Sequence, residues 1–461
     1  MRYVFAGALG VLVCLSLVAV AIQPREAAEG KIPLTWVSDD NPARREQIEL
    51  FNELHPEYHL TLDPSNTGMQ KVIVQCIGGV GPDIFDCYNA FQLSAYVRSG
   101  IAWDVTDQLA EAGIDVRKDC WDAGLPIMVF EGRVYGFLNN ASVNAIWLNK
   151  DIFDRNGIPY PKPDPETGWK WDELIPLAKR LTVRDAKGRV EHFGFMMDWW
   201  GWNHFVNQWG GRVYSPDGTR CVLDSPETIA AIQFMQDIIY KHGIAPDPVQ
   251  EAAMRSTGGW GSGTITFFGG GKAAMAMGGR WWLCTLRKYE GLRLGAVESP
   301  HGPHRRFWAY GRTSLINKNG PRREEALAFL KYLASREFSE LINHQADALA
   351  PVKRFCYTEK YLHDPEFPDE DFNAMWRDVV AFGSPSEISP FVNGNVAGRI
   401  LNKQIDLVKS GQKPAAPAMQ DAARLINAEI QKTISRVPSL RKRYDELVAK
   451  RTGAEQGAVV P

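Results

Sequence analysis

Strand and helix patterns alternate along almost the whole chain, and this alternation constrains the fold more than any other feature. An apolar strand pattern at residues 32–37 is followed by a helical pattern and by a second strand pattern at 58–62. The clearest helix runs over 225–242, where Ser225 suits an N-cap and Pro226 suits the first turn. The other expected strands are 83–86, 132–137, 143–148 and 273–277, and the other expected helices are 150–156, 171–181, 322–333, 421–434 and 436–450, with the last ten residues frayed. This order predicts an α/β fold with largely parallel sheets.

The composition is that of a globular chain. Of the 461 residues, 45% are apolar and 23% are charged, which excludes a disordered chain, a collagen-like fibre and a multi-span membrane protein. Lys and Arg number 52 and Asp and Glu number 54, so the formal net charge is −2. A nearly neutral chain has no global attraction to nucleic acid, and no nucleic-acid partner is expected.

The N-terminus indicates export. Residues 3–22 carry no charge, Arg2 precedes them, and Ala19-Val20-Ala21 forms a small-x-small site. We therefore predict a signal peptide over residues 1–21. An uncleaved membrane anchor is the alternative, because about 20 apolar residues can also span a bilayer. Either way the rest of the chain is expected to be periplasmic or otherwise extracytoplasmic. It would be tethered to the membrane if residues 1–21 are not cleaved.

The cysteines leave their pairing open. Export permits disulfides, and six cysteines remain after cleavage: Cys76, Cys87, Cys120, Cys221, Cys284 and Cys356. Any pairing of the six and buried single thiols are equally compatible with the sequence. No C-x-x-C occurs, so zinc-ribbon and thioredoxin-like sites are not indicated, and neither a metal nor a cofactor is expected.

Common catalytic motifs do not occur. There is no H-E-x-x-H, no G-x-S-x-G and no G-x-G-x-x-G after the first strand, and Gly269-Gly270-Gly271-Lys272 is followed by Ala273 instead of Ser or Thr. The acidic pairs Asp39/Asp40 and Asp83/Asp86 stand near strand ends, and a glycosidase uses two such carboxyl groups. The chain is not expected to be an enzyme, but an exported carbohydrate-active enzyme with a carboxylate pair is kept as an alternative.

Aromatic residues gather in four places. Trp199, Trp200 and Trp202 lie in one run, Trp260 lies in a Gly-rich loop, Trp281 and Trp282 follow Gly279-Arg280, and Trp308 and Tyr310 precede Gly311-Arg312. These rings stand beside Gly, Asp, Asn and Arg rather than along apolar faces. Sugar rings offer flat C–H faces to aromatic rings and hydroxyls to polar groups, so the clusters indicate a carbohydrate pocket. For any single Trp, ordinary packing is the alternative.

Several sequence blocks resemble, in order, the extracellular solute-binding proteins of carbohydrate ABC transporters, the maltodextrin-type group of family 1. The most specific are Gly132-Arg133-Val134-Tyr135-Gly136 and Trp147-Leu148-Asn149-Lys150-Asp151-Ile152-Phe153, similar to "G-K-x-Y-G … Y-Y-N-K-D-x-F". The others include Gly81-Pro82-Asp83-Ile84-Phe85, Trp103-Asp104-Val105-Thr106, Trp171-Asp172-Glu173-Leu174, Asp224-Ser225-Pro226-Glu227 and Gly271-Lys272-Ala273-Ala274-Met275. The likeness spans about residues 32–435.

The resemblance implies a type II periplasmic-binding-protein fold, with two α/β lobes joined by a hinge and the ligand cleft between them. Mapped onto this chain, it places three crossings near Leu138–Val143, Tyr310–Thr313 and Ala348–Val352. Lobe one is then 30–139 plus 313–348, lobe two is 143–310 plus 352–435, and 436–461 is a charged C-terminal extension.

The resemblance also implies a function. The chain would be the extracytoplasmic substrate-binding component of an ABC transporter, closing its lobes on a sugar or oligosaccharide and delivering it to membrane permease subunits, and it would be a monomer. The expected ligand-binding residues are Asp39, Asp86, Asn139, Trp199, Trp200, Trp202, Trp260, Arg280, Trp281, Tyr310 and Arg312. The Arg residues leave an acidic sugar open, and an anchored sugar-sensing domain is a further alternative.

Overall fold

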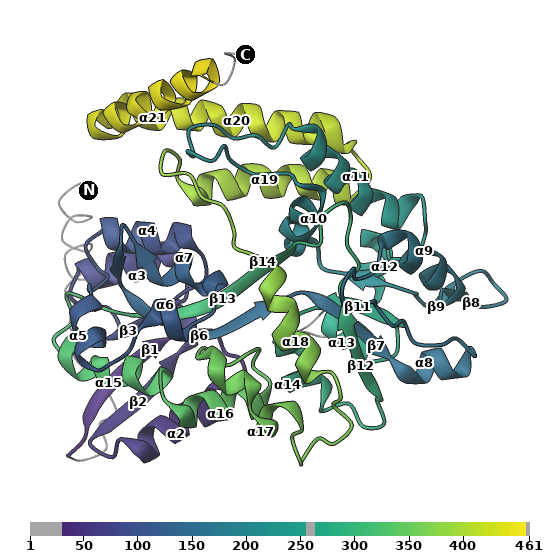
Figure 1. Ribbon diagram of the computed structural model, residues 1–461, viewed down its shortest axis with the longest axis horizontal. Helices are drawn as coiled ribbons and strands as arrows, with labels where there is room; N and C mark the ends of the chain where they lie inside the picture. The colour runs from purple at the N-terminus through teal and green to yellow at the C-terminus, as the bar shows by residue number, and fades with distance from the viewer. Residues whose placement is uncertain (1–29, 255–262, 458–461) are drawn as a thin grey trace, which may run out of the picture.

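A six-stranded sheet forms the centre of the first of two α/β bodies, which we call lobe one. The computed structural model describes residues 30–254 and 263–457. The strand order is β14-β13-β3-β1-β2, with β6 paired to β13. The bounds are β1 (Ile32–Val37), β2 (Tyr58–Asp63), β3 (Ile84–Cys87), β6 (Gly136–Val143), β13 (Phe307–Ile316) and β14 (Gly383–Ser384). Helices flank this sheet in Figure 1.

A four-stranded sheet forms the centre of the second body, lobe two. Its order is β10-β11-β7-β12, built from β7 (Ala145–Asn149), β10 (Met196–Met197), β11 (Met275–Gly278) and β12 (Leu294–Glu298). Two short hairpins, β4–β5 (Val129–Phe130 and Arg133–Val134) and β8–β9 (Val183–Arg184 and Val190–His192), complete the strands of the described chain.

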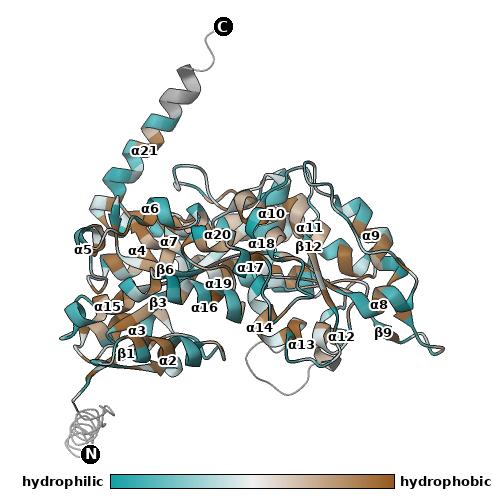
Figure 2. Ribbon diagram, turned by 60° about the horizontal axis from the view of Figure 1, so that its bottom comes forward, coloured by the Kyte–Doolittle hydropathy of each residue, from teal (hydrophilic) through white to brown (hydrophobic). Residues whose placement is uncertain are grey.

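The helices cover both sheets (Figure 1). In chain order they are α2 (Arg44–Leu54), α3 (Met69–Ile77), α4 (Ala90–Arg98), α5 (Thr106–Glu111), α6 (Val116–Asp119), α7 (Leu125–Met128), α8 (Lys150–Arg155), α9 (Trp171–Arg180), α10 (Trp202–Trp209), α11 (Pro226–Tyr240), α12 (Pro248–Met254), α13 (Thr264–Gly269), α14 (Leu283–Leu286), α15 (Arg323–Leu333), α16 (Arg336–Gln345), α17 (Glu359–Leu362), α18 (Asn373–Val379), α19 (Gly394–Lys409), α20 (Ala415–Arg436) and α21 (Pro438–Gly457). Figure 2 shows apolar residues on the inward faces of many of these helices.

Three segments run between the lobes. β6 and β13 lie side by side and antiparallel (Figure 1). The C-terminal half of β13 pairs with β3 of lobe one, and β6 is followed after one residue, Asn144, by β7 of lobe two. A third segment joins them through a bridge between Ala141 and Leu349. These segments lie near the three expected crossings, while the residue bounds of the lobes remain a prediction.

The expectation of largely parallel sheets is wrong. β1 pairs in parallel with β2 and β3, but β13 is antiparallel to β3 and β6, and β7 is antiparallel to both of its neighbours. The reason is the pair of segments that connect the lobes. A strand that returns from the other lobe enters the sheet in the opposite direction, whereas strands joined by a crossover helix run the same way.

Local sequence signals predict α11 and α15 well, whereas α20 begins at Ala415, before the expected residue 421, and the 16-residue helix α19 is not among the expected helices. The Ser225 hydroxyl accepts a hydrogen bond from the Thr228 N–H, Pro226 opens α11, and Ile232 and Met235 are buried along one face. The predicted end of the last helix at residue 450 is early, because α21 continues to Gly457. The expected signal peptide lies outside the described residues. Within 30–254 and 263–457, the helices are all too short or too polar to cross a membrane.

The six described cysteines are all free thiols. Five are buried, and Cys284 is partly buried. Burial raises the pKa of each thiol, to about 12 for Cys356. They therefore behave as small apolar side chains of the core, which agrees with the unpaired alternative.

Candidate ligand-binding site

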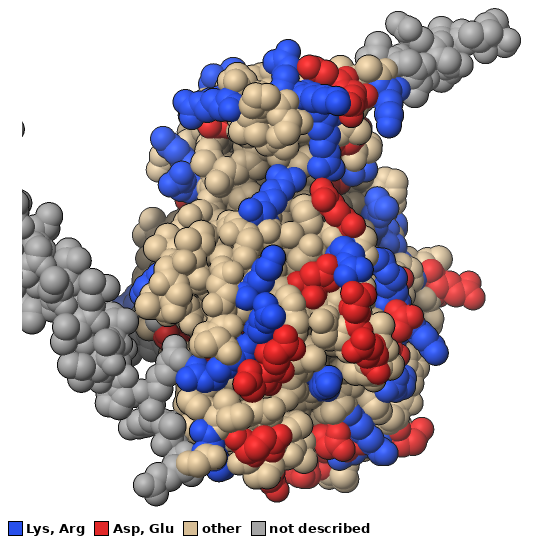
Figure 3. Space-filling view, turned by 90° about the vertical axis from the view of Figure 1, so that its left-hand side faces the viewer, with Lys and Arg blue, Asp and Glu red and all other residues tan. Residues whose placement is uncertain are grey.

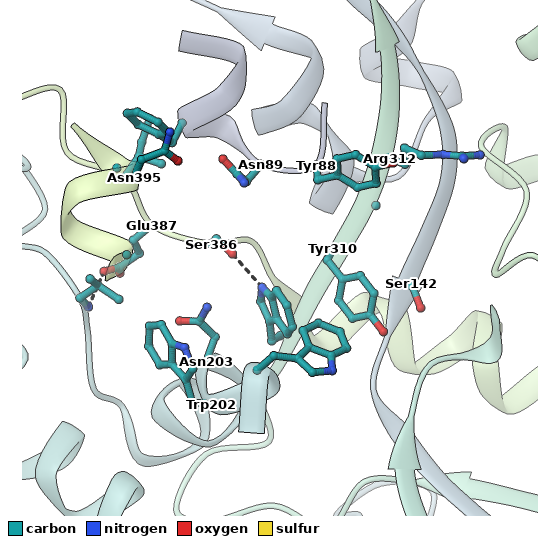
Figure 4. Close-up of a pocket in the computed structure, with 18 of the residues that line it drawn as sticks. Tyr88, Asn89, Ser142, Trp202, Asn203, Tyr310, Arg312, Ser386, Glu387 and Asn395 are labelled. Atoms are coloured by element: carbon teal, nitrogen blue, oxygen red, sulfur yellow. Dashed lines mark hydrogen bonds between the residues drawn. The ribbon is translucent and has the colours of Figure 1, made fainter. Parts of the chain in front are cut away.

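A cavity of about 640 Å³ lies between the lobes, against the segments that connect them. Lobe one contributes residues around Asp39, Arg44 and Tyr88, and lobe two contributes the aromatic run at Trp200–Asn203. The connecting segments contribute Asn140, Tyr310–Arg312 and Asp347–Ala348, and the stretch 386–398 completes the wall. In Figure 4, Trp202 and Asn203 face Tyr88 and Asn89 across this space.

One end of the cavity is a network of paired charges. Arg44 lies 3.0 Å from Asp39 Oδ1 through Nη2 and 2.5 Å from Asp347 Oδ2 through Nη1. Arg312 donates to the Ser38 hydroxyl at 2.9 Å and lies 3.6 Å from Asp347 Oδ2. Arg44, Arg312 and Asp347 are almost fully buried, whereas a third of the Asp39 side chain is exposed. The network thus presents one accessible carboxylate whose cationic neighbours are already paired.

The pKa values follow from this pairing. Burial raises the pKa of Asp347, but the charges of Arg44 and Arg312 and the hydrogen bonds from Arg44 and Gln47 outweigh it, so the pKa lies below its usual range. Deeper in lobe one, burial dominates at Asp86 and its pKa is raised. Asp347 is therefore ionised at neutral pH and holds both guanidinium groups in place.

Asp347 is held in a strained turn. Its neighbours Ala346 and Ala348 have φ angles of 60° and 70°, a left-handed conformation that residues with a Cβ rarely adopt. The Asn140 amide donates to the Asp347 carbonyl at 3.0 Å, and Arg280 Nη1 donates to the Ala348 carbonyl at 2.8 Å. Residues kept in such regions cluster at functional sites, because the surrounding structure has to enforce them.

The opposite wall is aromatic. The Trp200 ring lies edge-on to Trp308 and Tyr310, with centroids 5.1 and 5.6 Å away. The Trp281 indole donates to the Tyr310 hydroxyl at 2.9 Å, and this hydroxyl donates to Asn144 at 2.9 Å. Trp200 is 46% exposed despite its size. The polar atoms of Trp281 and Tyr310 are thus bonded within the protein, and a large aromatic surface stays available to a ligand.

The loop from β14 to α19 is fixed to lobe two beside this wall. The Trp308 indole donates to Ser386 at 2.8 Å, the dashed bond in the centre of Figure 4. Glu387 accepts from the backbone N–H groups of Val213 and Tyr214 at 2.9 and 3.0 Å and pairs with Arg212 at 2.8 Å. The Glu387 carboxylate is therefore committed to lobe two.

The structure brings one part of the expected site together. Six expected residues line the cavity: Asp39, Trp200, Trp202, Trp281, Tyr310 and Arg312. Trp260 lies outside the described residues. The remaining four, Asp86, Asn139, Trp199 and Arg280, are buried elsewhere.

Each of those four has a structural environment of its own. Asp86 accepts hydrogen bonds from Trp36, Ser38 and Ser314 behind the cavity wall. Neighbouring residues of a strand point to opposite faces, so Asn139 points away from the cavity because Asn140 points toward it. The Asn139 amide donates a hydrogen bond to the Ser314 hydroxyl instead.

Trp199 lies in the core of lobe two, and Arg280 contacts the strained turn between the lobes. Trp199 packs in the core of lobe two, while its neighbour Trp200 reaches the cavity. The Arg280 guanidinium donates to the carbonyls of Ala348 and Asn343 and to the Asn373 side chain, so it supports the strained turn from behind.

The sequence did not reveal several lining residues. Asn140 could have been found from strand alternation beside Asn139. Arg44 and Asp347 are 303 residues apart, and no local pattern signals a contact over that distance. The lining residues between 386 and 398 lie in a loop and a helix start with no ligand motif.

Known proteins share this architecture. A model of the bacterial extracellular solute-binding proteins matches residues 37–338. A protein of Brucella abortus (strain 2308) that is named for a binding role is 21% identical over 438 residues, which are 92% of this chain and 98% of that protein. Both results cover well over half of the chain.

Two solved structures match closely in shape. One is the ABC substrate-binding protein Lmo0181 from Listeria monocytogenes in complex with cycloalternan, with a TM-score of 0.73 at 20% identity over 88% of this chain and 99% of that one. The other is UgpB from Mycobacterium tuberculosis in complex with glycerophosphocholine, with a TM-score of 0.71 at 18% identity over 88% and 100%. They confirm the type II periplasmic-binding-protein fold, and the family match confirms the predicted class, a solute-binding component of an ABC transporter. This chain belongs to the bacterial extracellular solute-binding protein family.

Proposed function

We propose that this chain captures a neutral sugar or oligosaccharide in the cavity between its lobes and hands it to the permease of an ABC transporter. The observation that carries the proposal is the wall formed by Trp200, Trp281 and Tyr310, facing a polar end with hydrogen-bonding groups. A sugar has both kinds of surface, since its C–H faces stack on aromatic rings and its hydroxyls need donors and acceptors.

The charges of the lining residues favour a neutral ligand. Among the described residues the cavity is lined by the carboxylates Asp39, Asp347 and Glu387 and by the guanidinium groups Arg44 and Arg312. The two cations are already paired with Asp39 and Asp347. An anionic phosphate or uronate would meet no cation that lacks a carboxylate, and its desolvation would be uncompensated. On the outer surface, at the lobe-one end of the molecule, Figure 3 shows Lys and Arg interspersed with Asp and Glu.

Selectivity is expected from the polar end. Asp39 and Asn140 present a charged acceptor and an amide, and a sugar epimer that misplaces one hydroxyl leaves such a group unpaired. An unpaired buried polar group costs about 1–3 kcal/mol, enough to discriminate between epimers. The aromatic wall supplies affinity that depends less on hydroxyl configuration.

The alternative of a glycosidase has less support. Of the two acidic pairs in the sequence, Asp83 and Asp86 are buried in lobe one, and Asp39 alone of the four lines the cavity. Asp347 and Glu387 are held by Arg44 and by backbone N–H groups. Incubation with oligosaccharides should therefore leave them intact by mass spectrometry, and a cleaved product would contradict the binding role.

Binding can be tested with a thermal-shift panel on the mature chain. The panel contains maltotriose, mannotriose, arabinotriose, galacturonic acid and glycerophosphocholine. A ligand that binds only the native state adds about 2.7 kcal/mol at a hundredfold excess over its Kd. We expect a neutral sugar to raise the melting temperature, and a rise with galacturonic acid or glycerophosphocholine alone would refute the proposal.

A matched pair of variants locates the site. Trp200→Ala should abolish most of the shift, because it removes the most exposed ring of the wall. Tyr240→Ala is the control, since Tyr240 is exposed to a similar extent, 49%, on α11 outside the cavity. Equal loss in both variants would place the sugar elsewhere.

We further propose that the chain acts outside the cytoplasm, released or tethered by residues 1–21. The apolar run and its Ala19-Val20-Ala21 site support export. N-terminal sequencing of the protein from the membrane and soluble fractions distinguishes the two forms. A chain that starts at residue 22 is a released protein, and one that retains Met1 is anchored.

A further inference from the structure

The lobes touch on the side of the cavity away from the connecting segments. There the start of α4 in lobe one meets the start of α19 in lobe two, and Phe91 and Gly394 from these helices both line the cavity. Figure 4 shows the neighbouring residues Asn89 and Asn395 at this edge. We call the contact of Phe91 with Gly394 the rim contact.

The rim contact leaves no space for a side chain at residue 394. A Cβ built on Gly394 would lie 2.6 and 2.7 Å from the two Cδ atoms of Phe91 and closer still to Cγ. Heavy atoms that are not bonded do not approach so closely. The backbone of Gly394 is not in the left-handed region, so its conformation does not require glycine. The lack of space beside the Phe91 ring of the other lobe is the reason for glycine at this position.

Both sides of the rim contact are fixed to their own lobe. The Asn89 side chain caps α4 by accepting from the Gln92 N–H at 2.9 Å. The Asn393 side chain caps α19 by accepting from the Asn395 N–H at 3.0 Å. Just before α19, the Ser389 hydroxyl donates to the Gly218 carbonyl of lobe two at 2.6 Å. A larger residue at 394 would therefore push the lobes apart, because neither helix start is free to yield alone.

Further contacts between the lobes lie nearby. Arg98, at the end of α4, donates to the Pro390 carbonyl at 3.4 Å, and its guanidinium stands 5.7 Å from the Phe130 ring centroid. Arg443 of α21 lies 3.4 Å from Glu131. Both are exposed, and such contacts contribute little by themselves. The packed ring on the glycine is the contact with steric consequence.

We propose that Phe91 and Gly394 are positioning residues for ligand binding. The Phe91 ring packs on Gly394 only when the lobes are closed, and this rim contact determines how completely they close. The proposal rests on the proposed function in one respect, that a ligand is held by closure. A ligand can shift the two states only by its differential affinity for them, so a change that destabilises the closed state weakens binding without touching the ligand's polar contacts.

The contact itself is tested by a disulfide trap in the ligand-free full chain. In Phe91→Cys/Gly394→Cys the two Cβ atoms of the closed state are at most about 4 Å apart, within the range of a disulfide. Mild oxidation should give a cross-linked product, seen as a linked peptide pair by mass spectrometry. The single variants Phe91→Cys and Gly394→Cys control for links to native thiols. Absence of the link with and without the panel sugars would overturn the proposal.

The effect on binding is tested with the tightest binder among maltotriose, mannotriose and arabinotriose. Gly394→Ala should raise its Kd at least tenfold, and Phe91→Ala/Gly394→Ala should recover most of that loss, since the clash is gone. Gly68→Ala is the control, because a Cβ there meets no heavy atom within 4 Å and Gly68 is not a lining residue. An unchanged Kd for Gly394→Ala, or no coupling between the two substitutions in this double-mutant cycle, would overturn the proposed role of the rim contact.

The two arms separate the two proposals. If none of the three sugars binds but the cross-link forms, the sugar assignment fails and the closure contact stands. If a sugar binds and the Gly394→Ala variant binds it equally well, the proposed function stands and the proposed role of the rim contact is wrong.

Discussion

At the scale of single residues, the charged end of the cavity depends on Asp347. This carboxylate is 2% exposed and contacts two guanidinium groups that come from α2 and β13. Removal of Asp347 would leave the buried guanidinium groups of Arg44 and Arg312 with fewer compensating carboxylates, which is costly in a buried network. The turn that carries Asp347 is strained at both neighbouring residues, so its electrostatic contacts also hold the backbone in place.

We therefore predict that Asp347→Ala lowers the free energy of unfolding by about 3–5 kcal/mol. Urea denaturation followed by Trp fluorescence measures the effect. The control is Asp369→Ala, an exposed carboxylate, for which a change within about 0.5 kcal/mol is expected. Similar losses in both variants would mean that the buried network is not what Asp347 stabilises.

His204 gives a prediction on pH. It is fully buried, its Nδ1 accepts from the Trp308 N–H at 3.4 Å, and its Nε2 donates to Ser299, whose hydroxyl donates onward to Pro300. Burial lowers its pKa to about 3. A second proton on the ring would also face the Trp308 N–H, so the folded state needs the neutral imidazole.

The sign of the effect follows from the lowered pKa. Between pH 6.5 and about 3 the unfolded chain binds a proton that the folded chain does not, so stability is full above pH 6.5 and is lost as the pH falls. His204 should contribute a slope of about 1.4 kcal/mol per pH unit in this window. His204→Gln should reduce that slope in urea titrations from pH 6.5 to 4.5, whatever its absolute stability. An unchanged slope would show that another group titrates.

At the scale of elements, α21 packs against the core of lobe two through Leu440, Tyr444 and Leu447. The Tyr444 ring lies 5.2 Å from Phe391 at a near right angle, and its hydroxyl accepts from Gln431 at 3.2 Å. Arg451 adds hydrogen bonds to Asp217 and Thr219. Much of the helix surface is exposed, as its projection from the body in Figure 2 shows.

We predict that Tyr444→Ala loosens α21 without affecting the lobes. Amide hydrogen exchange over the described part of α21 should speed up, while exchange in β1, β3 and β13 stays as in the wild type. Arg441→Ala, which removes an exposed pair with Asp445, should leave α21 exchange nearly unchanged. Faster exchange throughout the molecule would mean that α21 stabilises the lobes as well.

The elements also show what sequence patterns could predict. Helix α11 carries its apolar face within its own 15 residues and its cap on the residue just before them. The strand at 32–37 is an apolar run in which Leu34 and Trp36 are buried, as the interior of a strand should be. Sheet direction was mispredicted, because β13 joins β3 across more than two hundred residues of intervening chain. The cavity residues show the same difference between local and long-range features. Trp200 and Tyr310 could be predicted because they lie in aromatic clusters of the sequence, whereas no neighbouring residues mark Asp347.

At the scale of the whole molecule, the lobes and their connecting segments form a cavity that is bounded on both sides. The strained turn and β13 close it at the hinge, and Phe91 with Gly394 closes it at the rim. Aromatic rings and paired charges line the space between. This arrangement suits a neutral ligand that is enclosed by closure, and it gives no excess positive charge for an anionic one.

Isothermal titration calorimetry of the mature chain with neutral trisaccharides and with the anionic trisaccharide trigalacturonic acid, in one buffer, tests this claim most directly. We predict that a neutral sugar binds with a Kd of about 1 μM or tighter, roughly −8 kcal/mol, and trigalacturonic acid at least a hundredfold more weakly. Tighter binding of trigalacturonic acid than of any neutral sugar would contradict the assignment of the cavity.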